Sequence, residues 1–298
     1  MVTAASCDLR VPAPTLTCLA VYSHPWMKRV LTALILAPAV LALVFFGPKW
    51  LIVLAAAAVS LLAGWEFLGL AEQCGARPPR VAAMVALGVL FAGNFEWPDQ
   101  TQVLLGGLGL GLLVYCTFRS PVKRVLLDAA TAVFALVYTG LTLLALPALR
   151  EQANGSSLVI FLLCVVWAGD ILALYAGRMW GRHKLAPALS PNKTWEGAAG
   201  SLLGSVAVAG LLLELGNLLA QWNFSRLSFA DDAWWYWLLL AAVVNVAAQV
   251  GDLAESALKR SAGVKDSGRL LPGHGGMLDR IDALLLAAPV LWYAQVIH

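Results

Sequence analysis

Residues 256–282 read SALKRSAGVKDSGRLLPGHGGMLDRID and form the most polar part of an otherwise apolar chain. They hold three aspartates, a histidine, five glycines and several Lys and Arg residues. Apolar segments flank the stretch, from Trp234 to Ala248 before it and from Ala283 to Ile297 after it. Because a charged side chain costs free energy inside a bilayer, a polar stretch between two expected membrane spans indicates a functional site.

The composition of the whole chain predicts an integral membrane protein. The 298 residues are 60% hydrophobic and 12% charged, whereas soluble domains average about 45–50% apolar and about 25% charged residues. Several of the twelve Trp residues lie near the ends of apolar segments, which is typical of aromatic belts at a membrane surface. The net charge of +3 is too small to indicate nucleic-acid binding. The five cysteines are scattered and form no C-x-x-C pair, so neither zinc nor a disulfide is indicated.

The apolar segments predict an all-α, polytopic fold of about nine transmembrane helices. A spanning helix needs about 20 mostly apolar residues. We expect the active site at the cytoplasmic ends of the C-terminal helices. The expected spans are 30–47, 50–71, 81–97, 101–118, 125–149, 157–177, 197–219, 234–254 and 279–297.

The sequence divides into three expected parts. Residues 1–26 are mixed and weakly periodic, and we interpret them as a disordered N-terminal extension or a start placed too early, because Met27 to Arg29 open the first long apolar run. A cleaved signal peptide is the alternative, but this run exceeds the usual apolar core and no small-residue cleavage site follows. Residues 27–155 would hold about five N-terminal helices, and residues 156–298 a catalytic domain of about four.

The distribution of Lys and Arg predicts the orientation in the membrane. If the N-terminus and every loop after an even-numbered span share one side, that side carries seventeen of the twenty cations, and the other carries Lys49, Arg150 and Arg226. The positive-inside rule then places the N-terminus and both polar loops, 178–196 and 258–278, in the cytoplasm. Leaving out the nine cations near the expected site gives eight against three, which favours the same orientation.

The polar loop before the seventh span forms the first group of candidate residues. A Ser-Pro pair that begins at Ser190 indicates a turn, and Ser190 or Thr194 could cap a helix that begins near Glu196. With Lys193 beside it, such a helix N-terminus is a natural phosphate site. A positive-inside loop followed by a capped helix explains the same residues without a ligand.

Acidic side chains inside apolar segments form the second group. Asp170 lies within an expected span, where a carboxylate costs about 2.5–3.5 kcal/mol on insertion scales. Asp252, Glu255, Ser256 and Lys259 follow the spacing i, i+3, i+4 and i+7, so they form one polar stripe that should face the interior of the bundle. An ion pair between Lys259 and one of the two acids is the purely structural alternative.

The start of the last span and the glycine-rich loop before it form the third group. Glycines on both sides of His274 allow the backbone to approach a ligand closely, although this histidine could also be merely solvated. Asp279 and Asp282 share one helical face, and with Asp252 they form an all-oxygen set that suits Mg²⁺ rather than zinc. Complementing the helix dipole is the alternative role for one of these acids.

Carboxylates for a metal, cations for phosphates and a surrounding membrane together indicate phosphoryl or nucleotidyl transfer to a lipid. The sequence contains no G-x-x-x-x-G-K-[ST] motif, which excludes an ATPase of the P-loop class.

Residues 256–282 resemble the signature of the phosphatidate cytidylyltransferases, or CDP-diacylglycerol synthases. The matching positions are Ser256, Leu258-Lys259-Arg260, Lys265-Asp266, Gly268, Leu271-Pro272, His274-Gly275-Gly276-Met277 and Asp279-Arg280-Ile281-Asp282. Further similarity is carried by Asp170, Tyr175, Gly177, Gly181, residues 190–197, Gly251-Asp252 and Glu255. The resemblance is strong over 165–298; before that it is limited to helical character and the Trp65-Glu66 segment.

The resemblance implies that the cytidylyl group of CTP is transferred to phosphatidic acid, giving CDP-diacylglycerol and pyrophosphate in phospholipid biosynthesis. It implies Mg²⁺ and leaves a second cation open. It also implies a multi-pass protein of a bacterial cell inner membrane whose active site faces the cytoplasm. The implied partners are CTP, phosphatidic acid and the lipid bilayer; a homodimer is left open, and no nucleic acid is expected.

The resemblance and the residue chemistry together give the expected site. The expected catalytic residues are Asp252, Lys259, Arg260, Lys265, Asp266, Asp279 and Asp282, of which Asp252, Asp279 and Asp282 would hold the metal. The expected substrate-binding residues are Tyr175, Ser190, Lys193, Thr194, Glu196, His274, Gly275, Gly276 and Arg280.

Other functions explain part of the pattern. A CTP-dependent kinase of an isoprenoid alcohol, or a related CDP-lipid synthase, shares the need for metal and nucleotide. A transporter would explain the acids at 170 and 252 but gives the basic, glycine-rich loop no task. A CDP-alcohol phosphotransferase is disfavoured because its paired aspartate motif is absent.

Overall fold

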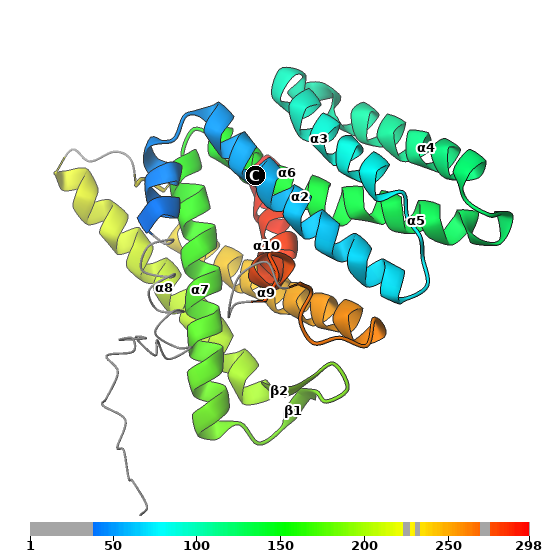
Figure 1. Ribbon diagram of the computed structural model, residues 1–298. Coiled ribbons are helices and arrows are strands. Elements are labelled where there is room, and N and C mark those ends of the chain that lie inside the picture. The colour runs from blue at the N-terminus through cyan, green and yellow to red at the C-terminus, as the bar shows by residue number, and fades with distance from the viewer. Residues whose placement is uncertain (1–37, 223–226, 230–232, 269–274, 298) are drawn as a thin grey trace, which may run out of the picture.

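Helices dominate the computed structural model, which describes residues 38–222, 227–229, 233–268 and 275–297 (Figure 1). Residues 38–46 are helical. The helices that follow are α2 (Lys49–Gln73), α3 (Arg80–Glu96), α4 (Thr101–Arg119), α5 (Val125–Ala135), the π-helical segment η3 (Leu136–Leu141), α6 (Thr142–Glu151), α7 (Gly155–Trp180), α8 (Trp195–Gln221), α9 (Trp234–Ser261) and α10 (Leu278–Ile297). Short 3₁₀ turns, η1 (Pro98–Gln100) and η2 (Val122–Arg124), precede α4 and α5.

The all-α, polytopic class is confirmed for the described part of the chain. There, seven helical segments are long and apolar enough to cross a membrane, and the run from Val122 to Glu151 counts as one of them. Helix α3 has 17 residues, or about 26 Å, which falls short of a hydrocarbon core of about 30 Å. Each expected span except the first is matched by a helix, whereas 30–47 lies partly outside the described residues. The number nine stays a prediction.

Helix α9 is longer than its apolar pattern predicted, since it continues past residue 254 to Ser261. The polar stripe forms these last turns. The helix then ends where Gly263 adopts a φ of +70°. The Val264 N–H donates to the Lys259 carbonyl and the Gly263 N–H to the Arg260 carbonyl, both at 3.0 Å. This pattern is a Schellman motif, in which glycine takes the left-handed conformation without steric cost.

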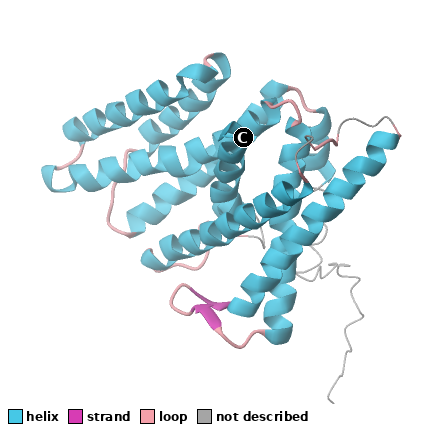
Figure 2. Ribbon diagram, turned by 180° about the vertical axis from the view of Figure 1, so that it is seen from behind, coloured by secondary structure: helices cyan, strands magenta, loops and turns pink. Residues whose placement is uncertain are grey.

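The expected loop 178–196 contains a β-hairpin that the sequence reasoning did not predict. Strand β1 (Lys184–Ala186) pairs antiparallel with β2 (Ser190–Thr194), with an irregularity in register between the two ends. The hairpin projects from the ends of α7 and α8 (Figure 2). Strand β1 has three residues and β2 is polar, so neither shows the apolar alternation that identifies a strand in a sequence.

Two hydrophobic cores divide the molecule, and α10 contributes to both. Leu278, Ile281 and Leu285 belong to a core shared with residues of α2, α3, α5 and α6, whereas Ala287 and Leu291 belong to a core shared with residues of α7, α8 and α9. In Figure 1, α10 accordingly lies between the α2–α5 group and the α7–α8 pair. The expected division at residue 155 stays a prediction, but the last helix joins the two parts.

Polar contacts show which loops share one end of the bundle. Lys49, at the start of α2, pairs with Glu151, at the end of α6, at 2.7 Å. The Arg150 guanidinium donates to the Val44 carbonyl at 2.9 Å. The two ends that carry Lys49 and Arg150 therefore lie together, as the assignment of both cations to the same side of the membrane requires.

We predict that Gly251→Ala loosens the contact between α9 and α10. A Cβ at Gly251 would stand 2.6 Å from the Asp282 carbonyl oxygen, which is backbone and cannot swing away. Overpacking of this kind costs about 1–3 kcal/mol of unfolding free energy. The matched control is Gly210→Ala on α8, where the nearest atom is a leucine methyl at 3.9 Å. The thermal midpoint of detergent-purified protein should fall for Gly251→Ala and stay level or rise for the control; equal midpoints would contradict the prediction.

Candidate active site

A cavity of about 670 Å³ lies where α7, the hairpin, α8 and α9 meet. Its wall mixes carboxylates, cations and small residues. The lining residues that matter for chemistry are Asp170, Arg178, Lys184, Asn192, Lys193, Thr194, Gln249 and Asp252. This combination of opposite charges in a recess between membrane helices is suited to a charged ligand rather than to a lipid tail.

Lys193 and Asp252 form an ion pair across the cavity, with 2.5 Å between the ammonium nitrogen and a carboxylate oxygen. This pair joins the hairpin to α9, although the two residues lie about sixty positions apart in the sequence. The carboxylates of Asp170 and Asp282 are close enough to that of Asp252 to repel it electrostatically. Three helices therefore direct acidic groups toward one region.

Thr194 starts α8 and shapes the floor of the cavity. Its hydroxyl oxygen accepts a hydrogen bond from the Gly197 N–H at 3.1 Å, so Thr194 is the N-cap, rather than Ser190, the other candidate in the sequence. Cβ atoms at Gly177 and Gly181 would stand 3.3 and 2.9 Å from Thr194 side-chain atoms. These two glycines let α7 approach the start of α8 closely.

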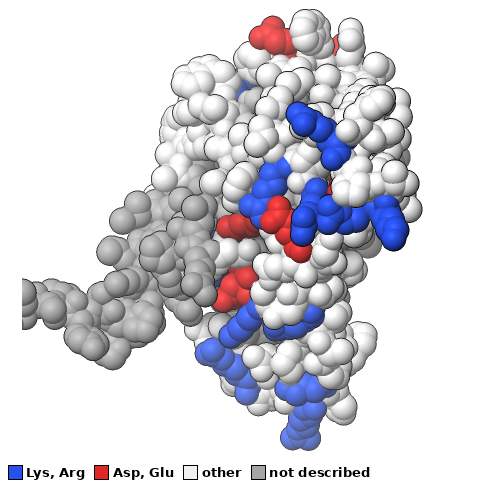
Figure 3. All heavy atoms as spheres, turned by 45° about the vertical axis from the view of Figure 1, so that its right-hand side comes forward, with Lys and Arg blue, Asp and Glu red and all other residues white. Residues whose placement is uncertain are grey.

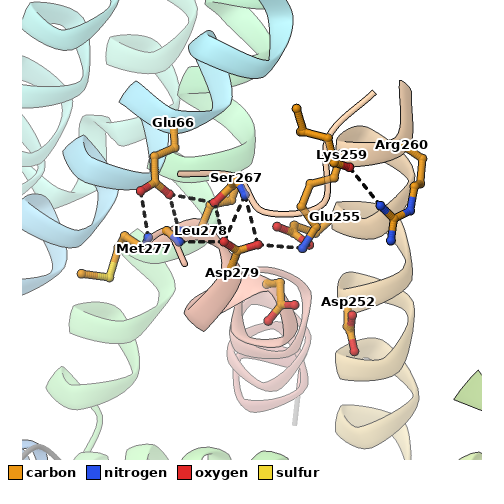
Figure 4. Close-up of polar contacts among 12 residues, drawn as sticks. Glu66, Asp252, Glu255, Lys259, Arg260, Ser267, Met277, Leu278 and Asp279 are labelled. Carbon is orange, nitrogen blue, oxygen red and sulfur yellow. Dashed lines mark hydrogen bonds and ion pairs between the residues drawn. The ribbon is translucent and has the colours of Figure 1, made fainter. Parts of the chain in front are cut away.

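Lys259 holds α9 and α10 together at the site. Its ammonium lies 2.5 Å from Glu255 and 2.7 Å from Asp279 (Figure 4). The exposed fractions of these side chains are 13% for Lys259, 0% for Glu255 and 8% for Asp279. The structural alternative for Lys259, an internal pair with Glu255, is therefore present, and the same ammonium also reaches the expected metal ligand Asp279.

Asp279 binds the backbone on both sides of residues 269–274. It accepts hydrogen bonds from the Gly276 N–H at 2.7 Å and from the N–H and hydroxyl of Ser267, both at 3.0 Å. The Asp279 side chain points toward Lys259 of α9. The Asp282 carboxylate accepts a hydrogen bond from the Ala283 N–H of its own helix at 2.8 Å. With Lys259 included, Asp279 has donors from three segments.

Arg260 links the two polar loops, because its guanidinium donates to the Leu189 carbonyl of the hairpin at 3.2 Å and to the Val264 carbonyl at 3.0 Å. Lys265 and Asp266 are exposed in the turn after α9. Asp266 lies beside Gly275, where a Cβ would come within 3.8 Å of it. Arg280 is exposed in the first turn of α10.

Six of the expected substrate-binding residues that the structure describes are not part of the cavity wall: Tyr175, Ser190, Glu196, Gly275, Gly276 and Arg280. Tyr175 is on α7 with 57% of its surface exposed. Glu196 pairs with His183 at 2.6 Å. Ser190 is paired with Ala186 in the hairpin. Their roles in binding stay predictions, and His274 lies outside the described residues.

The expected metal set was Asp252, Asp279 and Asp282. In the part of the chain that the structure describes, no three His, Cys, Asp or Glu side chains are grouped so that they could hold a metal ion. The assignment stays a prediction. Its chemical basis is the set of carboxylates at this end of the bundle: Asp170, Asp252, Glu255, Asp279 and Asp282 lie there among the cations Arg178, Lys184, Lys193 and Lys259.

Glu66 and Ser267 belong to the same network, although neither was among the expected site residues. The buried carboxylate of Glu66 on α2 accepts hydrogen bonds from the Met277 and Leu278 N–H groups, at 2.9 and 2.8 Å, and from the Ser267 hydroxyl at 2.9 Å (Figure 4). An acidic residue inside the apolar α2 segment was the available signal, by the same rule that identified Asp170.

The molecular surface repeats this charge pattern. Figure 3 shows acidic side chains in the middle of one face, with Lys and Arg above and below them. The surrounding Lys and Arg side chains attract a polyanion, and the acidic centre attracts a cation that could bind together with it.

Comparison with known proteins shows which family the chain belongs to. The model of the cytidylyltransferase family matches residues 27–298. The chain belongs to the cytidylyltransferase family. A phosphatidate cytidylyltransferase from Haemophilus influenzae is 33% identical over 292 residues, covering 89% of this chain and 97% of that protein. One from Mycobacterium leprae is 31% identical, covering 84% and 81%.

A shorter match has higher identity. The phosphatidate cytidylyltransferase of Brucella abortus is 46% identical over 158 residues, which is 53% of this chain and 54% of that relative. The chain thus matches about half the length of the Brucella relative. The resemblance inferred from residues 256–282 is confirmed at the level of the family.

Proposed function

We propose that this protein transfers the cytidylyl group of CTP to phosphatidic acid and releases pyrophosphate, as the names of its relatives indicate for them. The observation that carries the proposal is the pairing of the Lys193–Asp252 cavity with the Glu255–Lys259–Asp279 network at one end of the bundle. Cations and carboxylates occur there together, as a reaction between two anionic substrates requires.

In the proposed reaction, a phosphate oxygen of phosphatidic acid attacks the α-phosphorus of CTP. The bond from this phosphorus to the oxygen bridging to the β-phosphorus breaks, and pyrophosphate leaves with that bonding pair. The second pKa of a phosphate monoester is about 6, so the attacking group is mostly a dianion at neutral pH and needs little help from a base. The protein mainly has to neutralise charge and align the two substrates.

The cationic residues have defined places in this scheme. Lys193, Lys259, Arg260 and Lys265 neutralise the triphosphate and the lipid phosphate, with Arg178 and Lys184 available from the cavity wall. The N-terminus of α8 behind Thr194 offers further N–H donors to an anion. Asp266 orders the turn beside Gly275 or reaches the ribose.

Mg²⁺ is the cation that we propose for the acidic groups. Carboxylate oxygens are ligands that it accepts, and the carboxylates of α9 and α10 supply several of them at this end of the bundle. Asp252, Asp279 and Asp282 would hold it, and Asp279 would then share its oxygens with Lys259. A bound Mg²⁺ would neutralise phosphate charge. The identity of a second cation is left open.

We also propose an orientation with nine spans and with the site on the cytoplasmic face of a bacterial inner membrane. The support is the cation distribution: the ends that carry Lys49 and Arg150 lie together, away from the loops rich in Lys and Arg. CTP is a cytoplasmic nucleotide, so this face is the one where the substrate is available.

A double-label assay tests the function. Membranes containing the protein receive phosphatidic acid, Mg²⁺ and CTP labelled at either the α- or the γ-phosphorus. Cytidylyl transfer places α-label in the lipid and γ-label in pyrophosphate. A kinase would place γ-label in the lipid and release CDP. Absence of label from the lipid in both arms would contradict transfer of either kind and favour a transporter.

Asp279→Asn should lower product formation by roughly 100-fold or more, as when charge stabilisation is lost at a reacting phosphate. The variant removes the charge that pairs with Lys259 and that we assign to the metal. Membrane insertion should match wild type by immunoblot of the membrane fraction. The control is Asp99→Asn, an exposed acid at the start of η1. Full activity of Asp279→Asn would refute the assignment.

Lys265→Ala should raise the apparent KM for CTP about tenfold, because a charge-assisted contact to phosphate is lost. Lys265 is exposed beside the site and can reach a bound nucleotide. Lys123→Ala, which removes an exposed cation near the start of α5, is the control. Equal KM values for both variants and wild type would show that the Lys265 side chain points elsewhere.

A further inference from the structure

We propose that Glu66, in the N-terminal half of the chain, is a positioning residue that holds the start of α10 and thereby places Asp279 opposite Lys259. The expected effect of Glu66 on catalysis rests on the proposed function, whereas its role in holding the start of α10 does not. Glu66 is 9% exposed and lies on α2, about two hundred residues from its partners. It touches none of the residues that we assign to the cavity wall.

The carboxylate of Glu66 caps α10 from another helix. One oxygen accepts from the Met277 N–H at 2.9 Å and the other from the Leu278 N–H at 2.8 Å. The first N–H groups of a helix have no partner within it, and the helix dipole favours a negative charge there. Figure 4 shows both donors directed at Glu66 from the chain that enters α10. The side chain therefore fixes the position and direction of the first turn.

Ser267 connects this cap to Asp279. Its hydroxyl lies 2.9 Å from a Glu66 oxygen and 3.0 Å from an Asp279 oxygen. A hydroxyl has one proton, so it donates to one carboxylate at a time. Glu66 and Asp279 thus compete for the same donor, while the Gly276 N–H binds Asp279 and the neighbouring Met277 N–H binds Glu66. The two carboxylates work as one clamp on residues 267 and 276–278.

Tight packing shows that the clamp tolerates little displacement. A Cβ at Gly268 would come within 2.5 Å of a Glu66 oxygen, and one at Gly276 within 2.3 Å. Only glycine lets the backbone approach the carboxylate at these positions. The contact with Glu66, which lies outside residues 256–282, therefore explains why glycine occupies positions 268 and 276.

Length and charge are both required at position 66. Glu66→Gln keeps the length but turns one acceptor oxygen into an NH₂ donor that would face a backbone N–H. Glu66→Asp keeps the charge but withdraws the oxygens by one methylene from donors that lie at 2.8–2.9 Å. Either change frees the first turn of α10, and Asp279 with it.

The test compares Glu66→Gln and Glu66→Asp with Glu72→Gln in full-length protein in detergent. Glu72 lies on the same helix and pairs with Arg80 near the surface, outside the site. Hydrogen exchange of a peptide covering 275–284 should be faster in both Glu66 variants and unchanged in Glu72→Gln. In the cytidylyl-transfer assay, the apparent KM for CTP should rise about tenfold in Glu66→Gln, as expected when hydrogen bonds to a charged group are lost.

Two results would overturn the proposal. One is unchanged exchange of 275–284 in both Glu66 variants. The other is faster exchange with an unchanged KM, where kcat falls only in proportion to the fraction of folded protein, because that pattern describes a purely structural residue. If wild-type protein shows no cytidylyl transfer, the proposed function fails, whereas the exchange comparison still decides whether Glu66 holds α10.

Discussion

The contact between Lys259 and Asp279 is the constraint on which the arrangement of the C-terminal helices depends. Lys259 is shared by Glu255 on its own helix and Asp279 on the next, and all three side chains are nearly buried. Loss of Lys259 would leave both acids without their common partner, and removing one partner of a buried pair costs about 3–5 kcal/mol. The Lys259–Asp279 contact thus fixes how α9 and α10 are aligned, because separating the two charges would cost free energy. The close approach of the backbones at Gly251 favours the same alignment.

Uncharged polar residues continue the site into the bundle. The Asn245 amide donates to Ser201 at 2.9 Å and to Ser205 at 2.8 Å, and Gln249 donates to the Asn245 carbonyl oxygen at 2.7 Å. Ser201 and Gln249 also line the cavity. Between membrane helices such hydrogen bonds contribute about 0.6 kcal/mol on average, so their number matters more than any single one. Small residues such as Gly169 let α7 approach them closely. Several hydrogen bonds therefore hold α8 and α9 together along the cavity wall.

The sequence predicted the helices well because the membrane imposes a length and an apolar composition on each span. It predicted helix ends less well, since polar turns such as those of α9 extend beyond the apolar part. It also missed the hairpin, whose strands are too short to show an apolar alternation, and the π-helical segment at Leu136–Leu141. There the Ser60 hydroxyl donates to the Thr139 carbonyl at 2.8 Å, a contact between residues seventy-nine apart that no local pattern records.

The site residues divide in the same way. Lys259, Asp279, Lys193 and Asp252 were predictable as chemical groups, but not as the pairs that they form, because pairing depends on helix packing. Glu66 could not be assigned a role from local sequence, since its partners lie about two hundred residues away.

Because α10 packs in both cores, the N-terminal helices contribute to the site as well as the C-terminal helices. One face of α10 packs in the N-terminal core and the other in the C-terminal core, so the helix cannot shift without disturbing both. Glu66 acts on that first turn from the N-terminal side, and Lys259 acts on it from the C-terminal side. Asp279 is therefore placed by two independent sets of contacts. In the proposed reaction this carboxylate would hold a cation beside an anionic substrate while it also pairs with Lys259, and both tasks depend on such placement.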